Sequence, residues 1–371
     1  MESADFLIIG GGIAGLSAAA RLARHGRVRV IEAEEALGYH SSGRSVSFSH
    51  YGIGNEAVRG LTAHSRAFFE LPPDGFSPVP ISRTFATLYF ATAGDLPALA
   101  RLRADMAAFT DAIRMVDEAE MRALCPVLKA PRRGLFDPSG LKLDADALLQ
   151  SFARAVRASG GEIQMGERIE TIERQGENWV VNGRHGAPIL VNAAGAWADS
   201  VAALAGVTAL GLEPKRRTII AVDPPAGIDI SAWPFAHSVA GDFYMLPEAG
   251  RILASPVDEV PSDPGDAQPE DYDLALAADR LEHYTSVSVT RIAHRWAGLR
   301  TFTADRVPAA GFAPDAPGFF WLAGQGGYGL QTAPAMAEIV EALVTGAAWP
   351  VPGVAPAAIM PERLIIAAKT C

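Results

Sequence analysis

Residues 5–15 read Asp-Phe-Leu-Ile-Ile-Gly-Gly-Gly-Ile-Ala-Gly, an apolar run that ends in the spacing G-x-G-x-x-G. The run over residues 5–9 predicts a short buried strand, and the helical spacing over residues 16–25 predicts a helix that ends at Gly26. Residues 28–32 alternate in character and predict a second strand. Because the connecting loops are short, we expect a strand–helix–strand unit whose two strands are parallel.

The glycines of this turn and the acid after the second strand predict a dinucleotide site. Gly10 allows the tight turn, Gly12 lets the backbone approach a pyrophosphate, and Gly15 lets the helix pack closely on the strand. The N–H groups at the start of the helix face the phosphates, and the helix dipole favours the same contact. Glu32 follows at a spacing where a carboxylate hydrogen-bonds a ribose and repels a 2′-phosphate, so NADP is disfavoured. The alternative is a glycine-rich turn of an ordinary α/β protein.

Composition excludes several classes of protein. The chain has 371 residues, of which 49% are hydrophobic and 20% charged, with 36 Gly and 26 Pro. This composition excludes a disordered chain, a collagen-like chain and a small disulfide scaffold, and the length favours two domains or one large nested domain. The formal net charge of −10 gives no electrostatic reason to bind nucleic acid or an anionic membrane.

Cysteine use and the N-terminal run both lead us to expect a cytoplasmic protein. The two cysteines, Cys125 and Cys371, fit a reducing compartment and give a disulfide little support. Glu2 and Asp5 precede the apolar run where a secretory signal would carry basic residues, and no stretch reaches the ~20 apolar residues that span a bilayer. Peripheral contact with a membrane quinone pool stays open. The eight histidines are scattered, and no metal-binding pattern is present, so no metal site is predicted.

The rest of the sequence changes between an α/β and a β-rich texture. Between residues 218 and 289, short β-type runs alternate with Pro- and Asp-rich loops, which is typical of an antiparallel sheet. Helices are expected over residues 96–109, 118–124, 146–159 and 333–343. Strands are expected over residues 85–90, 162–164, 169–172, 179–181, 189–192, 218–222, 243–246, 251–255 and 319–322.

Two later segments favour FAD over NAD as the dinucleotide. Residues 191–197 (VNAAGAW) are a strand that runs into a small-residue turn, similar to the second dinucleotide contact of FAD-binding oxidoreductases. Residues 322–329 (LAGQGGYG) are a strand that enters a glycine-rich loop before a helix. Such a loop brings N–H groups to the N1/C2=O side of a flavin, where negative charge develops on reduction. A plain strand–helix turn is the alternative for this later segment.

Taken together, these segments resemble the D-amino-acid oxidase superfamily of FAD enzymes over nearly the whole chain, and most closely its D-arginine dehydrogenase branch. The resemblance implies an α/β fold, in which a Rossmann-like, glutathione-reductase-type FAD-binding domain carries an inserted α+β substrate domain on a mixed or antiparallel sheet. The implied FAD-binding domain comprises residues 1–80, 140–210 and 300–371, and the implied substrate domain comprises residues 81–139 and 211–299. The matching segments are residues 10–15 with Glu32, 38–45 (GYHSSGRS), 214–217 (PKRR), 243–244 (FY), 296–300 (WAGLR) and 325–329 (QGGYG).

The resemblance implies that FAD is held without a covalent bond, because neither Cys125 nor Cys371 lies in a segment that matches an anchoring cysteine of the flavinylated relatives. The residues that it implies around FAD are Gly10, Gly12, Ile13, Ala14, Gly15, Glu32, Ala33, Ser41, Ser42, Arg44, Ser45, Ile169, Ala194, Gly195, Trp197, Gly326, Gly327, Tyr328, Gly329, Leu330 and Gln331.

Three residues match family positions that hold a substrate α-carboxylate: Arg217, Tyr244 and Arg300. A carboxylate is well matched by the planar fork of a guanidinium, and a tyrosine hydroxyl adds a third hydrogen bond. The alternative is that the two arginines form structural salt bridges or lie solvated at strand ends. We expect the neighbouring Lys215 and Arg216 to be surface charges.

Departures from the D-arginine-oxidising relatives bear on the substrate side chain. Those relatives place His and Tyr where this chain has Phe48 and Ile53, and they use an acid near the segment that matches residues 83–87 (RTFAT). Without that acid a bound guanidinium loses its partner, at a cost of roughly 2–5 kcal/mol in a buried site. We therefore expect D-arginine and D-lysine to be poor substrates and the pocket to prefer a neutral or apolar side chain. His50 is either a polar group over the flavin or a structural histidine.

The resemblance implies oxidative deamination of an α-amino acid, most favourably of D configuration. The carboxylate would dock on the three residues named above, the Gly327 region would offer a backbone carbonyl to the amine, and the imino acid would hydrolyse to a 2-oxo acid and ammonia. An N-methyl or cyclic secondary amino acid, such as sarcosine, proline or hydroxyproline, is the alternative substrate. A flavin redox sensor or complex subunit without turnover is the alternative from another class. Oxygen and a quinone both stay open as electron acceptor.

Overall fold

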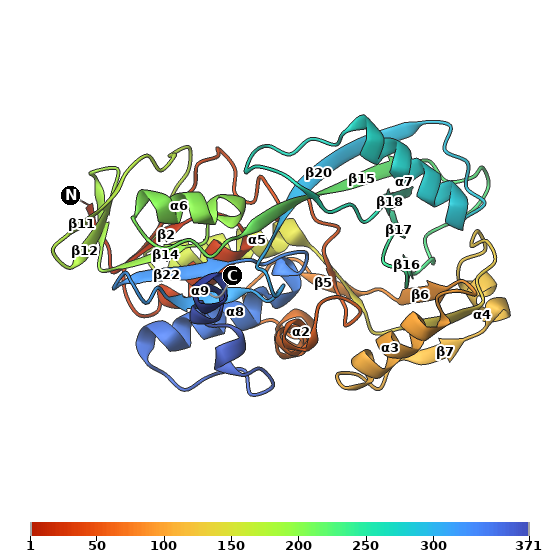
Figure 1. Ribbon diagram of the computed structural model, residues 1–371, viewed down its shortest axis with the longest axis horizontal. Helices are drawn as coiled ribbons and strands as arrows, with labels where there is room; N and C mark the ends of the chain where they lie inside the picture. Colours follow the sequence, from red (N-terminus) through yellow and green to blue (C-terminus); the bar gives the residue numbers. More distant parts are fainter. Residues whose placement is uncertain (1, 370–371) are drawn as a thin grey trace.

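The computed structural model describes residues 2–369, so Cys371 lies outside the described residues. One half of the molecule is built on a six-stranded sheet in the order β10-β3-β2-β14-β22-β21. All its strands are parallel except the edge strand β21. In chain order these strands are β2 (Phe6–Ile9), β3 (Val28–Ile31), β10 (Glu162–Gln164), β14 (Ile189–Asn192), β21 (Ala309–Phe312) and β22 (Phe319–Ala323). Figure 1 shows this sheet in one half of the molecule, with red, green and blue strands from distant parts of the sequence side by side.

The predicted strand–helix–strand unit is present, and its glycines meet the backbone closely. Helix α1 (Ile13–Leu22) begins three residues before the predicted start, because Gly12 occupies its N-cap. Gly10 has a φ of +109°, and a Cβ there would lie 2.4 Å from the carbonyl oxygen of Ala193. A Cβ on Gly15 would lie 1.9 Å from the carbonyl oxygen of Gly10. A side chain at Gly10 would therefore push against the turn after β14, and a side chain at Gly15 would force the helix away from the strand.

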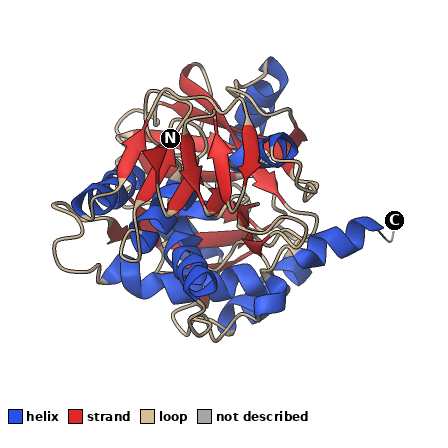
Figure 2. Ribbon diagram, turned by 90° about the vertical axis from the view of Figure 1, so that its left-hand side faces the viewer, coloured by secondary structure: helices blue, strands red, loops and turns tan. Residues whose placement is uncertain are grey.

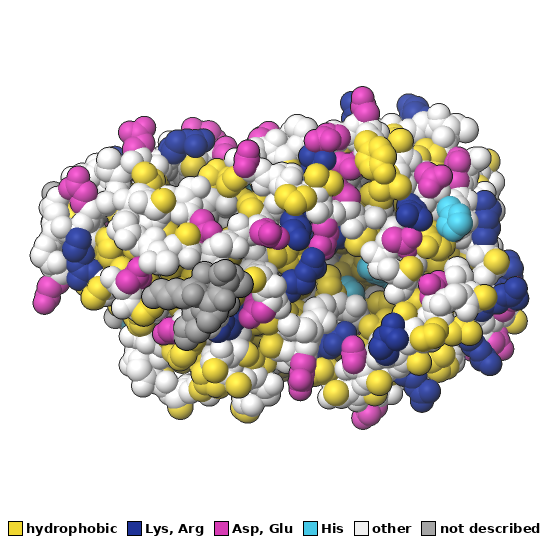
Figure 3. Space-filling model, in the orientation of Figure 1, with side chains coloured by type: hydrophobic (Ala, Val, Ile, Leu, Met, Phe, Trp, Pro, Cys, Tyr) yellow, Lys and Arg dark blue, Asp and Glu magenta, His cyan; other side chains and the backbone are white. Residues whose placement is uncertain are grey.

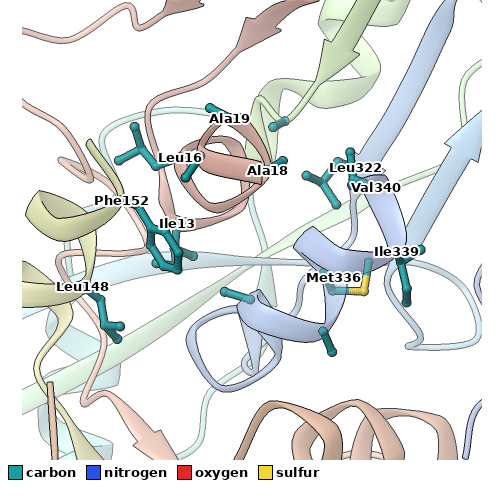
Figure 4. Packing of buried hydrophobic residues seen from close by; sticks show 14 of the residues in the cluster. Ile13, Leu16, Ala18, Ala19, Leu148, Phe152, Leu322, Met336, Ile339 and Val340 are labelled. Atoms are coloured by element: carbon teal, nitrogen blue, oxygen red, sulfur yellow. The ribbon is translucent and has the colours of Figure 1, made fainter. Parts of the chain in front are cut away.

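The sheet is buried on both faces, which is why its strands read as continuous apolar runs. Phe6 and Ile8 point into one cluster, formed with α1, α5 (Ala145–Ala158) and α8 (Gly329–Thr345). Leu7 and Ile9 point the other way, toward α6 (Ala198–Leu204) and a small four-stranded sheet. That sheet contains β1 (Glu2–Ser3), β11 (Ile172–Gln175), β12 (Asn178–Val181) and β13 (His185–Ala187). Figure 4 shows the first cluster from close by, and Figure 2 shows most helices below the strands.

The second half of the molecule is built on a nine-stranded mixed sheet, in which only the pair β6–β16 is parallel. Its longest members, β15 (Glu213–Val222) and β20 (Ile292–Phe302), pair antiparallel along their whole length, and helix α7 (Asp271–Tyr284) packs on β15. The other strands are β6 (Thr87–Ala91), β7 (Arg114–Val116), β8 (Arg133–Asp137), β16 (Phe235–Ser238), β17 (Tyr244–Glu248), β18 (Arg251–Ser255) and β19 (Val260–Pro261). The predicted fold class is confirmed.

The remaining elements are a small sheet and helices that flank one half or the other. A three-stranded sheet joins β4 (Phe48–Ser49), β5 (Ser82–Thr84) and β9 (Leu141–Leu143). Helix α2 (Glu56–Glu70) packs on α8, α3 (Leu96–Ala107) and α4 (Glu118–Leu124) flank β8, and α9 (Glu362–Lys369) follows near the C-terminus. The domain boundaries predicted from the sequence remain a proposal; the strands of the two large sheets fall on opposite sides of them, apart from the last residues of β20.

Some sequence predictions were wrong in position. The strand predicted over residues 169–172 begins only at Ile172, and α8 begins at Gly329 instead of residue 333. Three long elements, α2, α7 and β20, were not predicted at all. No helix among the described residues combines the length and the apolar character needed to cross a bilayer.

Candidate active site

A cavity of about 1070 Å³ lies between the two halves of the molecule. The space-filling view is hollowed at this place, and histidine atoms are visible inside the hollow (Figure 3). The cavity reaches the upper end of the range common for small-molecule sites. Every residue that the sequence places at FAD lines it except Gly15, which packs beneath the turn. The cavity is also lined by Arg217, Tyr244, Arg300, His50 and Gly327.

At the nucleotide end, the carboxylate of Glu32 is fixed by the backbone. Its Oε2 accepts the N–H of Gly11 at 2.6 Å, and its Oε1 accepts the N–H of Glu34 at 2.9 Å. Two charge-assisted hydrogen bonds hold the carboxylate at the end of β3, with free lone pairs on both oxygens for a ribose. Beside it, Ser42 accepts the N–H of Ile13 at 3.0 Å at the start of α1. The end of the cavity thus presents a helix N-terminus and an ordered acid, as a dinucleotide requires. Ala14 and Ala33 also line this end.

The loop over residues 41–45 ties the nucleotide end to β20. Ser41 donates a hydrogen bond to the carbonyl of Leu299, and the guanidinium of Arg44 donates to the carbonyls of Ala267 and Ala297 at 3.0 and 3.2 Å. Arg44 is also ion-paired with Asp266. Arg44 therefore both lines the cavity and joins the two halves of the molecule. Ser45 lines the cavity beside it.

The turn after β14 supplies the opposite side of the nucleotide end. The side chain of Asn192 accepts the N–H of Ala194 at 3.3 Å and donates to the carbonyl of Ala198 at 2.8 Å, which holds the turn. Gly195 has a φ of +56°, and the indole of Trp197 lies 4.6 Å from the ring of His40, centroid to centroid. Ile169 lines the cavity nearby.

The glycine-rich turn before α8 closes the middle of the cavity. Gly326 has a φ of +52°, and a Cβ there would lie 2.7 Å from the ring of Phe302. The side-chain amide of Gln325 is buried, and neither its nitrogen nor its oxygen has a partner among the described residues. An orphaned buried amide beside a helix N-terminus is typical of a site that a polar ligand fills. These residues fit FAD. Tyr328 donates its hydroxyl to the carbonyl of Arg306, and Gly329, Leu330 and Gln331 continue the lining.

Arg217 and Arg300 point to the same side of the β15–β20 ribbon. Arg217 pairs with Gly298, and Arg300 pairs with Lys215 two positions along, so both side chains lie on one face. Arg217 is 4% exposed, and its guanidinium donates to the carbonyl of Asp258 at 2.8 Å. Burial, and then the positive charge of Arg300, lower its pKa to about 10.

These two arginines differ in their counter-ions. Arg217 is ion-paired with Asp258 at 3.7 Å and with Glu259 at 3.5 Å, and Glu259 is also bound to Arg306. The guanidinium of Arg300 has no hydrogen bond or ion pair with any residue that the structure describes. The buried hydroxyl of Tyr244 likewise has no partner there. Two like charges and an orphaned hydroxyl around a cavity form an anion site.

Arg216 is not the surface charge that the sequence predicts. It is 8% exposed and its guanidinium binds Asp273 at 2.9 Å and Glu270 at 2.6 Å, both from the α7 side. The reason is the two-residue period of the strand, which turns Arg216 to the face opposite Arg217. Lys215, which shares the face of Arg217, binds Glu213 at 3.1 Å.

Two imidazoles stand beside the anion site, and the sequence identified only one of them. Nδ1 of His50 lies 2.6 Å from the hydroxyl of Tyr89, and burial lowers the pKa of His50 to about 4. His237, which was missed, lies on β16 directly opposite Tyr244, and burial lowers its pKa to about 3. The signal that could have found it is the spacing Phe235-x-His237, which puts the imidazole on the same side of the strand as a cavity-lining phenylalanine.

The rest of the pocket around the imidazoles is apolar. Phe48 and Phe235 contact each other at 4.5 Å between centroids, and Ile53 and Ile219 also line the cavity. The segment over residues 83–87 does not line it, and Arg83 instead stacks on the ring of Phe85. No cluster of three metal-ligating side chains occurs within residues 2–369.

Comparisons with known proteins agree with this architecture. A family model described as DAO, FAD dependent oxidoreductase, matches residues 5–343. The chain is 30% identical over 176 residues to FAD-dependent oxidoreductase domain-containing protein 1 of Bos taurus, covering 42% of this chain and 35% of that protein. It is 27% identical over 411 aligned positions to the tRNA 5-methylaminomethyl-2-thiouridine biosynthesis bifunctional protein MnmC of Burkholderia multivorans, covering 98% of this chain and 59% of that protein. The chain thus spans less than two thirds of either relative.

Solved structures show the same fold at low sequence identity. L-proline dehydrogenase from P. horikoshii superimposes with a TM-score of 0.84 at 21% identity, covering 99% of both chains. Glycine oxidase from Geobacillus kaustophilus superimposes with a TM-score of 0.83 at 21% identity, covering 94% of this chain and 96% of that chain.

Proposed function

The chain belongs to the DAO family of FAD-dependent oxidoreductases, and from this premise we propose that it oxidises the α-carbon of a small amino acid. The observation that carries the proposal is the anion site, where Arg217, Arg300 and the orphaned hydroxyl of Tyr244 surround one end of the cavity. A carboxylate bound there satisfies all three groups at once. The D-arginine dehydrogenase branch stays a prediction.

FAD is the cofactor, and when bound it accepts the hydride from the substrate Cα. The residues that would hold it are those of the nucleotide end, with Glu32 at the ribose, the α1 N-terminus at the phosphates and the turn before α8 at the ring. Because Gly15 only supports the turn, we assign it a packing role. The cysteine Cys125 is buried, and burial raises its pKa to about 12, so a covalent link through it is not part of the proposal.

The residues of the chain bind and orient the substrate. The two guanidinium groups and the Tyr244 hydroxyl hold the carboxylate and so fix the direction of the Cα–H bond. The reacting atoms are then positioned before the reaction begins, which lowers the entropic part of the barrier. Oxidation requires a neutral amine, and the backbone carbonyl in the Gly327 region would accept a hydrogen bond from it. Burial keeps His50 and His237 neutral, so neither adds a positive charge to the cavity.

We propose a D-configured substrate with a neutral side chain, which the apolar walls of Phe48, Phe235 and Ile53 support. Residues 83–87 contain no acid and do not line the cavity. This supports the expectation that D-arginine and D-lysine are poor substrates. A secondary amine such as proline or sarcosine is the second candidate, because the same carboxylate site would serve. The activities named for the structural neighbours, L-proline dehydrogenase and glycine oxidase, support keeping it. A flavin redox sensor without turnover is the candidate from another class.

Anaerobic mixing of the holoenzyme with D- and L-amino acids and secondary amines tests the proposal. We expect D-amino acids to bleach the flavin absorbance fastest. Faster bleaching by sarcosine or proline would replace the first candidate with the second, and no bleaching by any amine would favour the sensor.

Substitution of the anion site tests its role. Arg300→Ala should lower kcat/KM by at least about 100-fold while FAD stays bound. Arg295→Ala is the matched control, because Arg295 lies on the same strand and is exposed. Equal activity of the two variants would remove Arg300 from the site.

A further inference from the structure

Three polar rings form a cluster at one wall of the cavity. They are His50, which follows β4, Tyr89 on β6 and His237 on β16. Their centroids lie 6.0–6.2 Å apart, and Phe235 contacts both imidazoles at 5.6 and 5.1 Å. The His237 ring also lies 5.2 Å from that of Tyr244. The cluster is therefore next to the anion site, where the side chain of a bound amino acid would extend.

Hydrogen bonds fix which nitrogen of His50 carries the proton. The backbone N–H of Gly52 lies 3.2 Å from Nδ1 and can only donate, so Nδ1 is the acceptor. The hydroxyl of Tyr89, at 2.6 Å, donates to the same atom. In the neutral imidazole the proton is therefore on Nε2. No described residue accepts that proton, and His50 lines the cavity.

His237 offers a second unused group. Neither of its ring nitrogens is hydrogen-bonded to a side chain within residues 2–369, and the half-buried ring, which contacts the backbone of Ser238, lines the cavity. A neutral imidazole always carries one N–H and one acceptor nitrogen. The N–H of His50 and the ring of His237 thus lie at the same part of the cavity, with aromatic surfaces around them.

The charges around the two imidazoles are positive. Arg300 and Arg59 act on His50, and Arg217 and Arg300 act on His237. A cationic side chain would meet repulsion here, whereas an oxygen acceptor would give the N–H of His50 a partner.

We propose that His50 and His237 select an α-amino acid whose side chain ends in an oxygen acceptor, a carboxamide or a carboxylate, and that Tyr89 positions His50 by holding its Nδ1. The inference rests on the proposed function, because it takes the anion site as the position of the α-carboxylate. The inference narrows the neutral side chains of the proposed substrate to those that end in a carboxamide, and it adds side chains that end in a carboxylate.

Isosteric substrates test it. D-Asparagine, D-aspartate and D-leucine branch at the same carbon and differ in their acceptors. We expect kcat/KM for D-asparagine or D-aspartate to exceed that for D-leucine by about tenfold, the value of one to two hydrogen bonds. The first two substrates distinguish the carboxamide from the carboxylate. A preference for D-leucine would overturn the inference.

Variants assign the preference to the imidazoles. His237→Phe and His50→Phe should each lower the asparagine-to-leucine ratio of kcat/KM by about tenfold, mainly through KM. His237→Gln keeps a donor and should keep the preference. His294→Phe is the matched control, since His294 is an exposed histidine on β20. An unchanged ratio in both Phe variants would overturn the inference.

Binding of inert acids separates this inference from the proposed function. Succinamate, succinate and 4-methylpentanoate are the amine-free counterparts of the three substrates, and their dissociation constants can be read from the flavin absorbance. We expect succinamate or succinate to bind about tenfold more tightly than 4-methylpentanoate, and the advantage to vanish in His237→Phe. This binding preference is expected even if no amine reduces FAD. Failure of every amine to reduce FAD would contradict the proposed function and leave the inference intact. Equal binding of all three acids would overturn the inference.

Discussion

At the scale of single residues, the site depends on where two guanidinium groups can lie. A Cβ on Gly327 would lie 2.8 Å from Nη1 of Arg300 and 3.1 Å from its Cζ, so the absence of a side chain leaves room for the guanidinium. The atoms that would be displaced belong to the flexible end of Arg300, not to the backbone. A methyl group there should therefore disturb the anion site more than the fold.

Gly327→Ala should lower kcat/KM by about 10- to 100-fold and leave the melting temperature of the holoenzyme within a few degrees, because only the guanidinium must move. Steady-state kinetics and thermal melting measure the two effects. Gly353→Ala is the control, because a Cβ there meets no atom within 4 Å. A large loss of stability in Gly327→Ala would show that the backbone also depends on this glycine.

The neutral histidines make stability depend on pH. Burial lowers the pKa of His50 to about 4, below its unfolded value of about 6.5. As the pH falls, the unfolded chain takes up the proton first, so the stabilisation is complete above about pH 6.5 and is lost as the pH falls toward 4. We expect the loss from His50 to be on the order of 3 kcal/mol.

Urea unfolding of the apoprotein between pH 7 and 4 measures this loss. His50→Asn should flatten the pH dependence, and His294→Asn, at an exposed position, should leave it unchanged. The same slope in His50→Asn and the wild type would show that other groups, such as carboxylates, cause the acid sensitivity.

At the scale of elements, the two faces of the β15–β20 ribbon have different roles, one in the cavity and one in packing against α7. One face carries Arg217 and Arg300 toward the cavity. The other carries Arg216 to Asp273 on α7, where both side chains are buried. The ribbon is thus held to α7 by Arg216, the neighbour in sequence of the cavity-lining Arg217.

Asp273→Ala should destabilise the protein by about 3–5 kcal/mol, because it leaves Arg216 buried with only the exposed Glu270 as a partner. Chemical unfolding measures the loss. The double variant Arg216→Leu/Asp273→Leu should recover most of it, since a buried apolar pair leaves no unpaired charge. A double variant as unstable as Asp273→Ala would contradict this account.

The elements that the sequence predicted are those with a local signal. The turn over residues 10–15 combines a strand, glycines and a helix in one short stretch, and almost all the predicted FAD-site residues line one cavity. Strand β20 was missed because its first five residues, Ile292–Trp296, are exposed or half-buried and do not alternate between apolar and polar, and its pairing with β15 is set by tertiary contacts. His237 was missed because its place beside the anion site depends on the pairing of β16 with β17, which puts it opposite Tyr244.

At the scale of the whole molecule, the cavity lies between two halves that are joined by the ribbon, the small three-stranded sheet and the loop over residues 41–45. FAD bound in this cavity would contact both halves. Its binding should therefore stabilise the folded protein as a whole.

Removal of FAD should lower the melting temperature, and re-addition should restore it in a concentration-dependent way. At a free FAD concentration 100 times the dissociation constant the expected stabilisation is about 2.7 kcal/mol. Thermal melting over a series of FAD concentrations measures this effect, with riboflavin, which lacks the phosphates and adenosine, as the control ligand. A melting temperature independent of FAD would contradict the placement of the cofactor.

The strand order of the six-stranded sheet also has a consequence during synthesis on the ribosome. β14 lies between β2, made at the start of the chain, and β22, which begins at Phe319. At about 5–20 residues per second, the nascent chain waits on the order of ten seconds with the apolar edge of β14 unpaired. An open apolar edge invites association between chains, so chaperone supply and growth temperature should govern the yield of soluble protein more than the strength of the promoter.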